Sequence, residues 1–248
     1  MQKTLLFIVV VLLVFPGGLQ SQSSDVIEVG KFSAEDAGEA LPAGWKPLTF
    51  KNIDKHTLYR LVKDGDTTVV RAESMASASG LIRDMTINLK EYPFMQWRWK
   101  VDNILKKGDV RRKEGDDYPA RIYVAFEYAP GKLGLFEKAE YHLAKLLYGQ
   151  YPPLGAISYI WESREPVGSV VPNPFTGRVK MIVVESGAEN INRWVREQRN
   201  VYEDYKKAFG EDPPVISGVA IMTDTDNTGE SAAASYGDIL FTKASIRP

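Results

Sequence analysis

The sequence predicts a mainly β protein, an antiparallel β-sandwich of the jelly-roll, lectin-like kind with two short helical insertions. Its dominant pattern is a short run of alternating residues, rich in Val, Ile, Tyr, Phe and Trp, that ends at Gly, Pro, Asp or Asn. Many such runs separated by turns are typical of sandwiches and jelly rolls. The chain has no cysteine, so packing alone must stabilise the fold. Nine strands are expected, at 59–62, 68–73, 80–88, 94–101, 121–128, 156–163, 179–186, 216–223 and 237–244.

Two segments show helical spacing instead. Apolar residues recur every three or four positions over 135–148, and this run stops at Gly149. A second helix is expected over 200–209, because Asn200 can cap it, Glu203 stands in the capping-box position and Gly210 follows it. These two helices would interrupt the sandwich without changing its class.

The composition excludes several function classes. Residues 24–248 are long enough to bury one sizeable core, so a single domain is expected. The formal net charge of −1 leaves no electrostatic footprint for nucleic acid. With only His56 and His142 present, a triad built on histidine and a site with several histidine ligands are also excluded.

The first 23 residues have the order of a secretory signal peptide. Lys3 precedes an unbroken apolar run over 5–15, which is about half the length that spans a bilayer. Ser21 and Ser23 are small residues at the minus-three and minus-one spacing of a cleavage site. We therefore expect cleavage after Ser23, a periplasmic or secreted mature protein, and no membrane span in it.

An acidic loop near the C-terminus is the strongest candidate site. Five oxygen-bearing side chains lie between two apolar runs, and Gly229 permits a tight turn among them; they are Asp224, Asp226, Asn227, Thr228 and Glu230. Such oxygens suit a hard cation, so we expect Asp224 and Asp226 to bind a structural calcium ion. An EF-hand is rejected, because its bidentate Glu position is occupied by Ser235. The competing interpretation is that these side chains satisfy turn amides.

Strand alternation predicts a ligand-binding face. If Ile122 and the apolar residues two and four positions on are buried, Arg121, Tyr123 and Glu127 point the other way. Burial of the tryptophans at 97 and 99 likewise sends Arg98 outward. Aromatic rings beside charged groups suit a sugar, which offers both an apolar face and hydroxyls. The expected glycan-binding residues are Arg98, Arg121, Tyr123, Glu127, Trp161, Arg178 and Asp238.

Two further groups of polar residues have both a chemical and a structural interpretation. Asp116 and Asp117 are paired carboxylates that could divide acid and base roles in glycan cleavage, but adjacent side chains usually point apart, so a turn leading into a strand is preferred. Arg199 could clamp a carboxylate, as in an acidic sugar, or Arg196 and Arg199 could pair with Glu203 or Asp204 and hold the helix on the sheet; the second interpretation is favoured.

Several blocks in one order resemble a known family. The blocks are GDDYPARIYVAFEY, ISYIWES, WVREQRNVYEDYKKAFGEDPP and VAIMTDTDNTGESAAASYGDILF, and they are similar to the bacterial domain-of-unknown-function 3047 family over nearly the whole mature chain. That family has no established activity. In addition, the segment from Tyr236 to Ile239 resembles the last strand of jelly-roll carbohydrate-binding modules, which implies a glycan on a concave sheet face.

The sequence as a whole favours an exported β-sandwich that binds a glycan without catalysis. The alternative is a polysaccharide hydrolase or lyase on the same scaffold, with carboxylates drawn from Asp116, Asp117, Glu127, Asp224 and Asp238. A cell-envelope module that binds another protein is the third function class.

Overall fold

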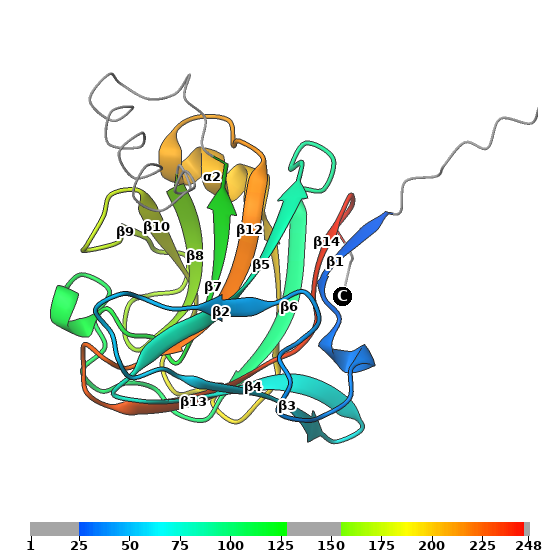
Figure 1. Cartoon of the computed structure of the whole chain (residues 1–248). Coiled ribbons are helices and arrows are strands. Elements are labelled where there is room, and N and C mark those ends of the chain that lie inside the picture. Colours follow the sequence, from blue (N-terminus) through cyan, green and yellow to red (C-terminus); the bar gives the residue numbers. More distant parts are fainter. Residues whose placement is uncertain (1–24, 128–154, 246–248) are drawn as a thin grey trace, which may run out of the picture.

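The computed structural model describes residues 25–127 and 155–245, which form two packed β-sheets (Figure 1). The expected signal segment 1–23 and the expected helix 135–148 lie outside the described residues. No helix in the described part of the chain is long and apolar enough to cross a membrane. The antiparallel sandwich predicted from the alternating pattern is confirmed.

Sheet A contains seven strands within the described residues. In the order β1-β14-β6-β13-β4-β3, these are β1 (Val26–Gly30), β14 (Ile239–Thr242), β6 (Phe94–Val101), β13 (Ser231–Tyr236), β4 (Thr67–Met75) and β3 (Leu58–Asp64). The seventh strand, β11 (Val195–Asn200), pairs with β6. Strands β13 and β14 both pair with β6, at opposite halves of its length. All pairings in this sheet are antiparallel.

Sheet B also contains seven strands in the described residues. Its order is β2 (Lys46–Leu48), β5 (Ala78–Ile87), β12 (Ile216–Asp224), β7 (Ala120–Phe126), β8 (Gly155–Glu162), β10 (Val179–Ser186) and β9 (Val170–Pro172). Strands β8 and β10 are parallel, and the remaining pairs are antiparallel. The neighbours β12, β7 and β8 stand side by side in the sheet (Figure 1).

All nine expected strands are present, with boundaries that shift by a few residues. The expected end of one of them, Tyr128, lies outside the described residues. Five strands were not expected: β1, β2, β9, β11 and β13. Three of these have at most five residues, β11 is rich in charged and amide side chains, and β13 is made mostly of Ala and Ser. β11 and β13 lack the β-branched and aromatic enrichment that identifies a strand, and β2 and β9 are too short to show an alternating pattern. β1 is rich in β-branched residues, so its composition does signal a strand.

An aromatic cluster joins the two sheets at the centre of the core. Trp97 and Trp99 of β6 are buried, as the alternation predicts. Trp97 packs on Tyr159 with 5.3 Å between ring centroids, and Trp99 packs on Trp161 with 6.0 Å. Trp161 is 0% exposed, so its expected place on a ligand-binding surface is wrong. Every residue of β8 is buried, and for this reason alternation could not assign its faces.

The helix expected over 200–209 is α2 (Val201–Phe209). Asn200 caps it by accepting a hydrogen bond from the Glu203 amide at 3.1 Å, and Gly210 ends it with a φ of +77°. Arg199 donates two hydrogen bonds to Asp204, at 2.9 and 2.6 Å. The structural interpretation of Arg199 is therefore confirmed. Two single-turn 3₁₀ helices complete the elements, η1 (Phe32–Ala34) and η2 (Lys113–Gly115).

Candidate functional site

A cavity of about 510 Å³ lies on the face of sheet B that points away from sheet A. Strands β7 and β12 supply its floor, the segment 50–53 forms one wall, and the turn between β9 and β10 forms another. The residues that line the cavity include Phe50, Lys51, Asp116, Arg121, Tyr123, Asn173, Phe175, Asp224 and Asp226.

Two-residue periodicity places the floor residues on this face. Ile122 and Val124 of β7 belong to the core between the sheets, so Arg121 and Tyr123 point outward. In the register of β7 and β12, Arg121 lies opposite Met222, and Asp224 is two residues further along the same face. The outward placement of Arg121 and Tyr123 together is therefore as the alternation predicts.

Arg121 and Asp224 form a buried ion pair at the base of the cavity. The Arg121 guanidinium donates through Nη2 to Asp224 Oδ2, and the whole residues are only 4% and 1% exposed. The amide of Tyr118 donates to the other oxygen of Asp224 at 3.4 Å. Within the described residues, Nε and Nη1 of Arg121 are buried without a hydrogen-bond partner. Such donors carry a desolvation cost inside the protein, because neither solvent nor a hydrogen-bond partner reaches them.

Asp116 occupies the wall beside this pair. Its carboxylate lies 3.9 Å from Arg121 Nη1, and it accepts hydrogen bonds from Tyr118 Oη at 3.0 Å and Asn173 Nδ2 at 2.9 Å. Burial raises the pKa of Asp116, and the nearby positive charge of Arg121 opposes that rise. Asp116 is therefore held in place by neighbours on two different loops.

Asp117 points away from Asp116, toward the acidic loop. Its two oxygens accept hydrogen bonds from the backbone amides of Asn227, at 3.3 Å, and Thr228, at 2.6 Å. The adjacent carboxylates thus serve different neighbours, in agreement with the turn interpretation of this pair. Gly229 closes the same loop with a φ of +68°, a conformation that favours glycine.

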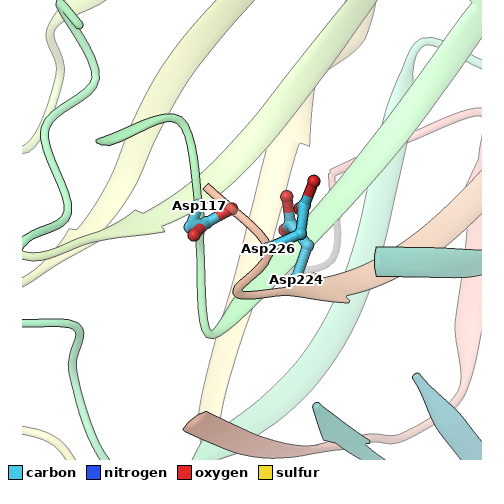
Figure 2. Close-up of side chains that lie close together, drawn as sticks. All are labelled: Asp117, Asp224 and Asp226. Carbon is cyan, nitrogen blue, oxygen red and sulfur yellow. The ribbon is translucent and has the colours of Figure 1, made fainter. Parts of the chain in front are cut away.

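Three carboxylates of this region converge (Figure 2). One oxygen from each of Asp117, Asp224 and Asp226 lies within 4.8 Å of the others. Burial raises the pKa of Asp224 strongly, and Arg121 opposes this effect; burial and then Asp117 also raise the pKa of Asp226. Asp224 and Asp226 therefore lie together, and Asp117 adds a third carboxylate that the sequence did not indicate. Calcium binding stays a prediction.

The expected ligand-binding residues do not form one surface. Arg98 of β6 and Asp238 lie on sheet A, where both line a different cavity, and Arg121 and Tyr123 lie on sheet B. Glu127 is exposed just beyond the end of β7, and Arg178 lies in the turn before β10. The single shared surface is wrong because alternation assigns a face within a strand but not the sheet to which that strand belongs.

Three contributors to the cavity were not indicated by the sequence. Phe50, Asn173 and Phe175 come from loops far from β7 in the chain. Asn173 precedes Pro174 and accepts a hydrogen bond from the Phe175 amide at 3.0 Å, which is the local bond of an Asx turn. The Asn-Pro pair signals this turn, but nothing local signals what the turn covers.

The fold and the cavity define a β-sandwich protein with one polar, aromatic-rimmed site on an outer sheet face. Residues 43–240 match a family described as a protein of unknown function, DUF3047. The chain belongs to this family, in agreement with the resemblance seen in its sequence. No curated protein matches the sequence.

Several solved structures are similar to the chain at low identity. The glycoside hydrolase domain of Endo-D from Streptococcus pneumoniae R6 has a TM-score of 0.32 and 8% identity; the match covers 82% of this chain but only 22% of that one. A cellulase derived from Cel12A of Rhodothermus marinus has a TM-score of 0.44 and 10% identity, over 87% and 99%. The module CBM27-1 of Caldicellulosiruptor saccharolyticus, solved with mannohexaose, has a TM-score of 0.35 and 10% identity, over 90% and 100%. Likeness at these low scores does not indicate a function for this chain.

Proposed function

We propose that the protein is exported and binds a glycan, without catalysis, in the cavity on the outer face of sheet B. The observation that carries this proposal is the pairing of a buried polar floor with an exposed aromatic rim in one cavity. Binding sites for small ligands combine apolar walls with a few fixed polar groups. Export rests on the order of residues in the segment 1–23.

The rim offers aromatic surface to a sugar ring. Phe175 is 55% exposed and Phe50 is 38% exposed, and both line the cavity. The exposed parts of these rings are available to a ligand, and Lys113 Nζ lies 5.3 Å from the ring centroid of Phe175. The CH face of a pyranose ring is apolar enough to stack on such rings, and this contact costs little side-chain entropy.

The floor offers fixed donors and acceptors to hydroxyl groups. Lys51 lines the cavity and can donate to a sugar oxygen, whereas Nε and Nη1 of Arg121 are buried from solvent. Carboxylates of Asp116, Asp224 and Asp226 line the same space and can accept from sugar hydroxyls. Three carboxylates against Arg121 and Lys51 favour a neutral or amino sugar over an acidic one.

Glycan hydrolysis is the second candidate, and the raised pKa values of Asp116 and Asp226 favour it. A carboxyl group with a raised pKa can act as a general acid. However, Asp116 accepts from Tyr118 and Asn173, and Asp224 is paired with Arg121. Two of the three cavity carboxylates are thus engaged in structural bonds, an arrangement that favours binding over an acid–base pair.

A glycan array probed with mature protein, residues 24–248, tests the proposal. Calorimetry on the glycans that bind should then show weaker binding for Tyr123→Ala, by about 1 kcal/mol or more, and for Phe175→Ala. Val26→Ala is the matched control, since it shortens an exposed apolar side chain on sheet A. Release of reducing ends from a bound glycan would favour hydrolysis, and an array without binding would contradict the proposed function.

A further inference from the structure

Two arginines face each other across the outer surface of sheet A. Arg98 of β6 and Arg196 of β11 are direct partners in an antiparallel register, so their side chains leave the same face of the sheet. That face is the outer one, because Trp97 and Trp99, the neighbours of Arg98 in β6, are buried in the core. Like charges placed opposite each other in a sheet are destabilising. A negatively charged group close to both arginines would therefore stabilise the folded state.

Among the described residues, Asp64 is close enough for its negative charge to act on Arg98. Neither Arg98 nor Arg196 has a carboxylate partner in this part of the chain, whereas the neighbouring Lys100 pairs with Asp64. Arg98 instead stacks on Trp194, with its guanidinium carbon 4.4 Å from the ring centroid. This stacking fixes the plane of the guanidinium and leaves its N–H groups free of a carboxylate.

Both arginines line a cavity of about 370 Å³. The cavity also contains Asp238, but Ser33 donates to that carboxylate through its amide at 2.8 Å and its hydroxyl at 2.5 Å. Ser33 therefore fixes the position of the Asp238 carboxylate. Gln96 and Glu197 line the same space. Burial raises the pKa of Glu197 to about 8, which disfavours its negatively charged form.

We propose that this cavity is a second ligand site, which binds an oxyanion group, a carboxylate or sulfate, between Arg98 and Arg196. Planar guanidinium groups bind such oxygens in pairs of hydrogen bonds, and an anion between two of them removes their mutual repulsion. The oxyanion has two possible sources, a free small anion or the acidic groups of a polysaccharide. This site lies on the opposite sheet from the glycan cavity and does not depend on the function proposed there.

Thermal unfolding of mature protein in sodium sulfate, with sodium chloride of equal ionic strength as reference, tests the first source. Calorimetric titration with polygalacturonate tests the second. The wild type should bind one or both, and Arg196→Gln and Arg98→Gln should each weaken that binding by about tenfold or more. Without sulfate at low ionic strength, Arg196→Gln should melt at or above the wild-type temperature, because the like-charge pair is gone.

Two controls separate this site from general effects. Lys207→Gln removes an exposed positive charge from α2, so it should leave binding unchanged. Phe175→Ala alters the rim of the sheet B cavity and should also leave it unchanged. Sulfate stabilises many proteins by exclusion from their surface, and that effect would be equal in all variants. The proposal would be overturned if the wild type, Arg196→Gln and Arg98→Gln showed equal stabilisation by sulfate and equal binding of polygalacturonate. It would also be overturned if Lys207→Gln weakened binding as much as the two arginine variants do.

Discussion

Arg121 donates a hydrogen bond to Asp224 where β7 and β12 lie side by side, and both side chains are almost completely buried. The same two residues line the cavity on the outer face of sheet B. Removing one partner of a buried ion pair strongly destabilises the folded state, because the remaining charge has no solvent to stabilise it. This pair therefore links the stability of sheet B to the polar floor of the proposed site.

Replacement of one member of the pair should be costly. Asp224→Ala is expected to lower the free energy of unfolding by about 3–5 kcal/mol, because Arg121 then stays buried with only Asp116 nearby. Urea unfolding of both proteins measures the difference. In the double variant Arg121→Met with Asp224→Ala, part of the loss should be recovered. A loss below about 1 kcal/mol in the single variant would show that the pair is solvated.

Ionisation of Glu197 should lower the free energy of unfolding as the pH rises. Burial, followed by the negative charge of Glu185, raises the pKa of Glu197 from 4.5 to about 8. The folded state thus holds a proton that the unfolded state releases, so the stability present below pH 4.5 is lost as the pH rises toward 8. Glu197→Gln removes this dependence. Urea unfolding at pH 5 and pH 8 should show a stability gain for the variant at pH 8 only. Parallel pH profiles for the two proteins would contradict the assignment.

Calcium should stabilise the acidic loop. Asp117, Asp224 and Asp226 bring three carboxylates together, and a ligand that binds only the folded state raises the melting temperature by mass action. Asp226→Asn is the informative variant, since Asp224 also pairs with Arg121 and its loss would disturb the fold. Millimolar calcium should raise the melting temperature of the wild type but not of Asp226→Asn. Identical melting curves in calcium and in chelator would leave only the turn function of the loop.

Export predicts a specific N-terminus. Protein recovered from the periplasm or medium of an expressing bacterium should begin at Ser24, because Ser21 and Ser23 have the spacing of a cleavage site. Intact-mass measurement checks the position directly. Cytoplasmic soluble protein that retains residues 1–15 would contradict export.

The sequence predicts the fold class and the local elements well, because these depend on near neighbours. The alternation in β6 correctly places Trp97 and Trp99 in the core, and Asn200 with Gly210 correctly brackets α2. Alternation does not assign the faces of β8, because the outer face of this strand is covered by a second apolar cluster that includes Ile160 and Tyr118. When both faces of a strand are buried, alternation is lost.

The candidate site is predicted only in part. Arg121 and Tyr123 share a strand, and Asp226 lies two residues after Asp224, the last residue of β12, so spacing alone brings each pair together. The meeting of the two pairs depends on the register of β7 with β12, and Phe175 arrives from a distant turn. Such long-range pairing leaves no local signal in one sequence.

The crystal structure of mature protein with the tightest-binding glycan from the array tests the central claim most directly. We predict a sugar ring in the sheet B cavity, stacked on Phe175 or Phe50, with one of its oxygens within about 3.2 Å of an Asp226 carboxylate oxygen or Lys51 Nζ. A glycan bound on any other surface, with the sheet B cavity empty, would contradict the proposed site.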